Sequence, residues 1–244
     1  MNDQRDLEGI SALVTGATSG IGKAAAEELG RHGAEIVVHG RDVDRGSAVV
    51  DTITTAGGKA RFVAADLTYP AQVDYLVEQV GPVDVLVNNA GFSWFGPTAD
   101  LDVATFDRLF ATNVRAAYFL VAALAPKMAG RGSGSIISIG SMAGQIGLAG
   151  GAAYSATKAT LAAMTRSWAA EFSPSGIRVN AIAAGPVLTN GAAPDRIEAL
   201  GATTLLARPA QPDEIAGVIA FLASPTASYI TGAVIAADGG RTAI

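Results

Sequence analysis

The chain has 244 residues, half of them apolar and 16% charged, so it can bury a large core and is not a disordered chain. Its net charge of −5 gives no footprint for nucleic acid, and the lack of cysteine excludes disulfides and thiolate chemistry. The only two histidines, His32 and His39, lie in one helix–strand unit and give little support for a metal site. Because residues 1–8 are polar and acidic, we expect no signal peptide and a cytoplasmic protein.

Short apolar segments alternate with helical segments along the whole chain. This order predicts an α/β fold, a Rossmann-type doubly wound parallel sheet of about seven strands with helices on both faces. We find no repeat or linker, so we predict a single dinucleotide-binding and catalytic domain over residues 1–244. The strands are expected near 11–15, 35–39, 60–64, 83–87, 135–139, 177–182 and 233–237.

A glycine-rich turn follows the first expected strand and precedes a segment of helix-forming residues. It reads Gly16-Ala17-Thr18-Ser19-Gly20-Ile21-Gly22. Strand, glycine turn and helix form the context in which backbone N–H groups bind the pyrophosphate of a dinucleotide. The glycine spacing differs from the common Gly-x-Gly-x-x-Gly fingerprint, which leaves an ordinary glycine turn as the alternative; the two flanks favour the dinucleotide site.

The end of the second expected strand bears on the choice of cofactor. NAD enzymes commonly place an acidic residue there for the ribose hydroxyls, whereas this chain has Gly40 followed by Arg41. A guanidinium pairs well with a 2′-phosphate, so we expect NADP(H) to be preferred, with NAD(H) possible. Asp42 is interpreted as the cap of a helix over 43–56, and a contact with the ribose is the alternative.

An apolar run at 116–125 is the longest in the chain and is too short to span a bilayer, so we expect no membrane association. A helix that is apolar on every side must be buried on every side. The outer flank of a doubly wound monomer cannot bury it alone. The sequence therefore predicts a subunit interface at this helix, with the helix over 153–172 beside it.

A Ser…Tyr-x-x-x-Lys constellation is formed by Ser141, Tyr154 and Lys158. Tyr154 and Lys158 lie one helical turn apart and so share a face. A tyrosine that acts near pH ~7 needs its pKa lowered by about 3 units, and one ammonium ~5 Å away supplies about 3 kcal/mol toward that shift. The pattern predicts an acid–base tyrosine, and the alternative is a core tyrosine beside a lysine that reaches to solvent.

The residues that follow these motifs are candidates for the walls of a substrate pocket. Aromatic and aliphatic side chains there favour an apolar ketone or secondary alcohol, and we identify no cation for an acidic substrate. Loop packing is an equally good interpretation of the aromatic pair. Residues 190–208 lack clear periodicity and are interpreted as a substrate flap over the site. The wall candidates are Ser93, Trp94, Phe95, Gln145, Ile146 and Leu148, with Val187.

With these motifs in order along nearly its whole length, the chain resembles the short-chain dehydrogenase/reductase family, and within it the 3-oxoacyl-ACP reductase-like members. Further marks that carry the resemblance are Asp66-Leu67, Asn88-Asn89-Ala90-Gly91, Asn113, Gly185-Pro186-Val187-Leu188-Thr189 and Ile230-Thr231-Gly232…Asp238-Gly239-Gly240.

The resemblance implies a role for each matching residue. Tyr154 would exchange a proton with the substrate oxygen, and Lys158 would lower its pKa and bind the nicotinamide ribose. Ser141 would hydrogen-bond the substrate oxygen, and Asn113 would hold a water that completes a proton relay. The cofactor would also contact Asp66 and Leu67 at the adenine, Asn89, Ala90 and Gly91 along its length, and Pro186, Val187 and Thr189 at the carboxamide. Family members commonly form homotetramers through the two helices named above, with the strand near 233–237 completing a second interface.

Two departures from the family pattern bear on the cofactor and the substrate. Ser19 stands where many NADP-preferring members carry a basic residue, and Ser175 stands where carrier-protein reductases often have one. We expect hydride transfer between NADP(H) and a small-molecule ketone or secondary alcohol. A 3-oxoacyl thioester reductase is the alternative within the enzyme class. A non-catalytic dinucleotide-binding redox regulator is the alternative outside it.

Overall fold

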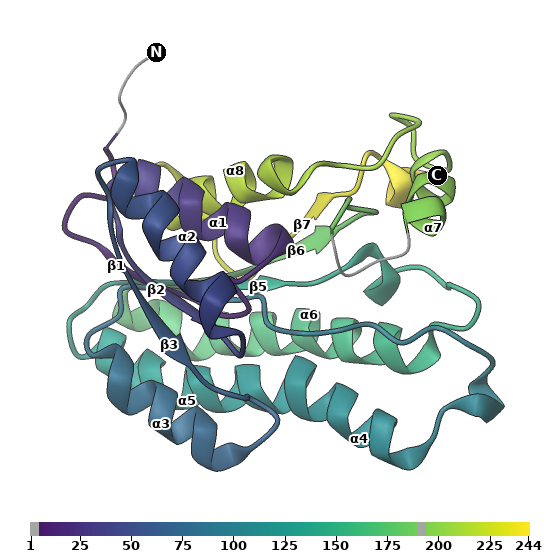
Figure 1. Ribbon diagram of the computed structural model, residues 1–244, viewed down its shortest axis with the longest axis horizontal. Helices are drawn as coiled ribbons and strands as arrows, with labels where there is room; N and C mark the ends of the chain where they lie inside the picture. The colour runs from purple at the N-terminus through teal and green to yellow at the C-terminus, as the bar shows by residue number, and fades with distance from the viewer. Residues whose placement is uncertain (1–4, 190–193) are drawn as a thin grey trace.

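The computed structural model describes residues 5–189 and 194–244 and contains a seven-stranded, all-parallel β-sheet (Figure 1). The strand order is β3-β2-β1-β4-β5-β6-β7, which confirms the predicted Rossmann-type fold. Each expected strand is present, with its ends shifted by a residue or two. The strands are β1 Ser11–Val14, β2 Glu35–Gly40, β3 Lys59–Ala64, β4 Val85–Asn88, β5 Gly134–Ile139, β6 Ile177–Ala184 and β7 Val234–Ala237.

Helices cover both faces of this sheet (Figure 1). One buried cluster joins the sheet to α1, α2 and α8, and a second joins it to α3, α5 and α6. Successive strand residues point to opposite faces, so Ala12 and Val14 belong to the first cluster and Leu13 to the second. The helices are α1 Gly20–Arg31, α2 Val43–Thr55, α3 Pro70–Val80, α4 Val103–Phe110, α5 Ala116–Ala129, α6 Ala152–Phe172, α7 Pro194–Gly201 and α8 Pro212–Ala223.

The order of the strands fixes the position of the functional site. β1 lies between β2 and β4, so the chain turns to one side of the sheet after β1 and to the other side after β3. The loops that leave the carboxyl ends of β1 and β4 therefore diverge. This divergence creates the crevice at which open α/β sheets bind their ligands.

The apolar run at 116–125 lies inside a longer helical stretch than expected. Val103–Ala129 is helical over 27 residues with a mean hydropathy of 1.4, so by length and composition alone it could cross a membrane. Half of its apolar window is buried inside the protein. One face packs on the sheet through Leu120 and Leu124, whereas Tyr118 and Phe119 are 48% and 51% exposed. The apolar outer face that the sequence predicted is therefore present.

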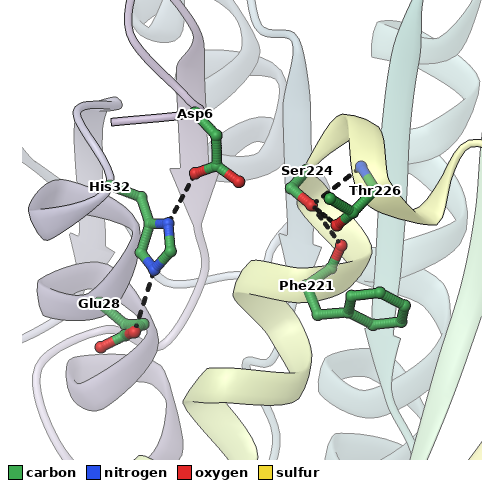
Figure 2. A network of polar contacts seen from close by, with 6 residues as sticks. All are labelled: Asp6, Glu28, His32, Phe221, Ser224 and Thr226. Atoms are coloured by element: carbon green, nitrogen blue, oxygen red, sulfur yellow. Dashed lines mark hydrogen bonds and ion pairs between the residues drawn. The ribbon is translucent and has the colours of Figure 1, made fainter. Parts of the chain in front are cut away.

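Polar contacts fasten the chain at the amino edge of the sheet. The ring of His32, just after α1, lies between Asp6 Oδ1 at 2.7 Å and Glu28 Oε1 at 3.2 Å (Figure 2). The neighbouring α8 ends where the Ser224 hydroxyl donates to the Phe221 carbonyl at 2.9 Å (Figure 2). The Thr226 hydroxyl forms a hydrogen bond with the same Ser224 hydroxyl. These contacts satisfy groups at the two helix ends far from the crevice.

Candidate active site

A cleft of about 550 Å³ lies at the carboxyl edge of the sheet. Its walls come from the turn after β1, the loops after β4, β5 and β6, the start of α6, and α7. Segments that are more than a hundred residues apart in the chain therefore share one cavity. Three of the four predicted catalytic residues line it: Ser141, Tyr154 and Lys158.

The geometry around Tyr154 brings those three side chains together. Tyr154 and Lys158 follow each other by one turn of α6, and the Lys158 ammonium lies 5.7 Å from the centre of the Tyr154 ring. Ser141, just after β5, lies close enough to Tyr154 for its hydroxyl to lower the pKa of the phenol. Its hydroxyl also accepts from the Ala143 N–H at 3.1 Å, which fixes the turn that carries it. The predicted convergence of phenol, ammonium and hydroxyl is thus present.

Burial dominates the electrostatics of this group. It lowers the pKa of Lys158 from 10.5 to about 8, and the ammonium donates to the Ile139 carbonyl at 2.7 Å. Burial also raises the pKa of Tyr154, and the hydrogen bond from Ser141 offsets only part of that rise. The sequence argument considered only the attraction of the lysine charge. In this arrangement Tyr154 is a neutral phenol, the form that can donate a proton.

Asn113 lies behind the cleft wall rather than on it, in a π-helical turn over Ala111–Arg115 between α4 and α5. Its amide N–H groups donate to the Phe92 carbonyl at 2.9 Å and the Thr157 hydroxyl at 3.1 Å. Its carbonyl oxygen accepts from the Phe92 N–H at 3.0 Å. The carbonyl oxygen of Asn113 keeps one lone pair that can accept a further hydrogen bond. Asn113 therefore ties the loop after β4 to α6, and its water-holding role stays a prediction.

The glycine turn is too tight for side chains. A Cβ at Gly22 would lie 2.3 Å from Asn89 Nδ2, and Gly16 and Gly20 have φ angles of +65° and +54°. Ser19 is the N-cap residue of α1 but makes no side-chain cap, so first-turn N–H groups of the helix remain open at the cleft. This donor set fits a pyrophosphate, which a helix N-terminus attracts.

Two buried polar side chains hold this turn from beneath. His39 accepts from the Gly16 N–H at 3.2 Å and donates to the Ala65 carbonyl at 3.1 Å, an arrangement that requires a neutral ring. Burial lowers the pKa of His39 from 6.5 to about 4, which keeps the ring neutral. Thr15 accepts from the Asn89 and Ala90 N–H groups, both at 3.0 Å. The sequence marked His39 only as a surface or structural residue. Its position at the end of a buried strand was the available signal.

The predicted cofactor residues divide into two groups. Those outside the cleft lining include Arg41, which is exposed at the end of β2, and Asp42. Asp42 caps α2 by accepting from the Arg45 N–H at 3.0 Å, as interpreted from the sequence. The Thr18 side chain fills the space that a Cβ at Gly40 would occupy. Also outside are Gly22, Asp66 and Leu67, whereas Gly16, Ser19, Gly20, Ile21, Asn89, Ala90, Gly91, Pro186, Val187 and Thr189 line the cleft.

The predicted substrate positions also divide. Ser93 and Leu148 line the cleft, whereas Trp94 packs over Gly96. Gln145 is exposed and Ile146 half-buried, and neither lines the cleft. Sequence reasoning missed α7, whose Arg196, Ile197 and Leu200 form part of the wall. Of the predicted flap, residues 190–193 lie outside the described residues.

Comparison with known proteins identifies the family to which this fold belongs. A family model described as enoyl-(acyl carrier protein) reductase matches residues 16–242. The structure of a short-chain dehydrogenase/reductase family protein is 48% identical and has a TM-score of 0.91, covering 98% of this chain and 100% of its own. The chain belongs to the short-chain dehydrogenase/reductase family.

Two further relatives illustrate the range of this family. Cis-4-hydroxycyclohexanecarboxylate dehydrogenase from Sinomonas cyclohexanicum is 39% identical over 96% of either chain. A structure assigned as an NAD(P)-dependent gluconate 5-dehydrogenase from Beutenbergia cavernae, with NADP bound at low occupancy, is 37% identical. Its TM-score is 0.94 over 99% of this chain and 100% of its own. The present short-chain dehydrogenase/reductase is accordingly an NAD(P)-dependent oxidoreductase that acts on CH–OH groups.

Proposed function

We propose that the protein transfers a hydride between NADP(H) and a ketone or secondary alcohol, with Ser141, Tyr154 and Lys158 as the acid–base group. The observation that carries this proposal is the convergence of these three side chains in the cleft that also contains the glycine turn. When bound, the nicotinamide ring supplies or accepts the hydride. The relatives' names, which include dehydrogenases of hydroxy acids, support the reaction class.

The protein side of the reaction follows from the electrostatics. As a carbonyl is reduced, negative charge develops on its oxygen. Tyr154, a neutral phenol, donates a proton there, and the Ser141 hydroxyl donates a hydrogen bond to the same oxygen. Lys158 holds a buried positive charge beside the phenol and stabilises the phenolate that remains. Asn113 keeps the loop after β4 and α6 in register through Phe92 and Thr157.

The glycine turn and its supports would hold the dinucleotide. The first-turn N–H groups of α1 would bind its pyrophosphate, and Thr189, whose side chain lies beside Gly20, lines the same cleft together with Val187. Arg41 favours NADP(H), because it is exposed and, in the described part of the chain, forms no ion pair within 4 Å, and the Asp66 carboxylate acts on it only at longer range. Ser19 supplies no second cation, so NAD(H) is the weaker alternative substrate.

A 3-oxoacyl thioester reductase is the second candidate function. A structure assigned as a β-ketoacyl-ACP reductase, 47% identical to this chain, favours it, whereas Ser175 in place of a basic residue counts against a carrier-protein partner. A catalytically silent redox regulator is the third, and it would not require the complete acid–base group. Turnover of a carrier-bound 3-oxoacyl substrate, compared with free ketones, separates the first two. Any Tyr154-dependent turnover excludes the third.

We further propose a cytoplasmic homotetramer assembled through the outer face of α5 and α6. Tyr118 and Phe119 are exposed on α5, and the Tyr118 ring lies 6.2 Å from the Trp168 ring of α6. The two helices are therefore adjacent, and the exposed aromatic residues of α5 lie beside α6. Sedimentation of the parent and of a Phe119→Glu variant tests this assembly, because a buried charge would separate the subunits.

Tyr154→Phe is the decisive experiment for the dehydrogenase function. The variant keeps the ring that packs 5.4 Å from Phe95 and loses only the phenolic oxygen. We expect kcat for ketone reduction to fall by about 10²–10⁴-fold with the fold unchanged by circular dichroism. A variant as fast as the parent would show that this site is not where the chemistry occurs.

A further inference from the structure

Helix α7 carries a cation into the substrate side of the cleft. The guanidinium carbon of Arg196 lies 3.5 Å from the centre of the Phe95 ring, and the Phe95 ring lies 5.4 Å from the Tyr154 ring. The Arg196 guanidinium is therefore no farther from the Tyr154 ring than these two distances added together. A contact as short as that with Phe95 requires the guanidinium to stack on the ring.

The charge of Arg196 is not neutralised within the described part of the chain. No hydrogen bond or ion pair joins it to a carboxylate there, and its guanidinium lies over the Phe95 ring instead. The other charged residue among those described in the cleft lining is Lys158, which is also a cation. Residues 190–193, Asn-Gly-Ala-Ala, contain no acidic residue. The two charged side chains described in the cleft lining are therefore both cations.

Stacking leaves the hydrogen-bonding edge of the guanidinium available. The aromatic contact uses the face of the group, whereas its N–H donors lie in its plane and suit a carboxylate in bidentate geometry. Phe95 also fixes the orientation of the side chain, which reduces the entropy lost on binding. Neither wall of this part of the cleft offers an acid that would attract an amine.

We propose that Arg196 binds a carboxylate on the substrate, so that the preferred substrates are small hydroxy and oxo acids rather than neutral ketones. The inference rests on the proposed dehydrogenase function and assigns its substrate class. Because Phe95 contacts both Arg196 and Tyr154, the carboxylate and the reacting carbon can be parts of one short molecule.

The test compares oxo acids with their methyl esters, which keep the ketone and remove the charge. We would measure kcat/KM for 4-oxopentanoate and 5-oxohexanoate against the two esters, with NADPH, for the parent, Arg196→Gln, Arg196→Lys and Glu198→Gln. Glu198 lies on the same helix outside the cleft lining and is the matched control. The parent should favour the acids by about 10- to 100-fold. Arg196→Gln should abolish that preference through KM, Arg196→Lys should retain part of it, and Glu198→Gln should leave it unchanged.

A binding experiment covers the case in which these ketones are turned over slowly. Calorimetry with NADP⁺ present should show pentanoate binding at least about 10-fold more tightly to the parent than to Arg196→Gln. Equal binding to both proteins, or an equal loss of activity on acids and esters, would overturn the carboxylate assignment. A raised KM for NADPH with all substrates would overturn it too, because Arg196 would then serve the cofactor.

The two proposals can fail separately. If the parent reduces the esters as well as the acids, and Tyr154→Phe abolishes both activities, the dehydrogenase function stands and the carboxylate inference falls. If Tyr154→Phe leaves every rate unchanged, the proposed function falls first.

Discussion

At the amino edge of the sheet, the charged groups near the end of α1 are paired with one another: His32 with Asp6 and Glu28, and Arg31 with Glu28. At the carboxyl edge, the start of the same helix has no side-chain cap and no acidic residue in its first turn. Among the described residues, Lys158 is buried there without an acidic partner, and Arg196 stacks on an aromatic ring without one. One helix thus ends in satisfied contacts and begins in open donors, so the edge with open donors is the one arranged for ligands.

This comparison predicts that substituting the cations without an acidic partner at the carboxyl edge changes activity more than stability, and that substituting the paired groups at the amino edge does the reverse. The predictions below run from the largest expected effect to the smallest.

Lys158→Met should lower kcat by about 10²–10³-fold, because the buried positive charge beside Tyr154 is lost. Its stability should change by only about 1 kcal/mol: removing a buried ammonium offsets the loss of the donor to the Ile139 carbonyl. Steady-state kinetics and urea unfolding measure the two effects. Lys127→Met, at an exposed lysine, is the control. A large loss of stability at position 158 would contradict the comparison.

Lowering the pH should destabilise the protein through His39. Its pKa is about 4 in the folded protein against 6.5 when unfolded, so between these values the unfolded chain binds more protons. The stabilisation is complete above pH 6.5 and falls by up to about 3 kcal/mol as the pH decreases toward 4. His39→Gln can keep both hydrogen bonds and cannot titrate. In urea unfolding at pH 7.5 and 5, the parent should lose more stability than this variant. Equal losses would exclude His39 as the source.

Arg41→Ala should lower the ratio of kcat/KM for NADPH over NADH by about 10-fold, because one charge-assisted contact to the 2′-phosphate is lost. Asp42 remains bonded to Arg45 and keeps α2 capped, so stability should be unchanged. Parallel assays with the two cofactors measure the ratio. An unchanged ratio would remove the argument for NADP(H).

His32→Ala should cost about 1 kcal/mol of stability and leave kcat and KM unchanged, because the contacts that it removes are partly exposed and lie at the amino edge. Thermal and urea unfolding measure the loss, and the same preparation serves for kinetics. A change in kcat would show that the two edges are coupled.

The sheet and the acid–base group were predictable because their signals are local. The strands are short apolar runs bounded by polar and glycine residues, and Tyr154 and Lys158 are one helical turn apart. Helix α7 was not predictable in the same way. It has eight residues, and of these only Gly201 is buried, so its sequence shows little apolar periodicity. The position of Arg196 over Phe95 depends on tertiary packing between segments a hundred residues apart.

The sequence argument lowers the pKa of Tyr154, whereas the structure raises it, and the reason is related. The sequence gives the spacing of the phenol and the ammonium but not the solvent around them. Burial acts on both groups, and the ammonium donates to a backbone carbonyl of β5. Likewise, the Asn113 amide hydrogen-bonds Phe92 and Thr157, and these three residues lie on segments that only the folded chain brings together.

The position of Arg196 over Phe95 separates substrate selection from proton transfer. Evolution and protein engineering can therefore change one of these properties without the other. The proton donor belongs to a long helix packed on the sheet, whereas the selecting cation belongs to a short peripheral one. Exchange of one arginine, or of the eight-residue segment around it, would redirect the enzyme toward neutral or cationic alcohols while its reaction chemistry remained in place.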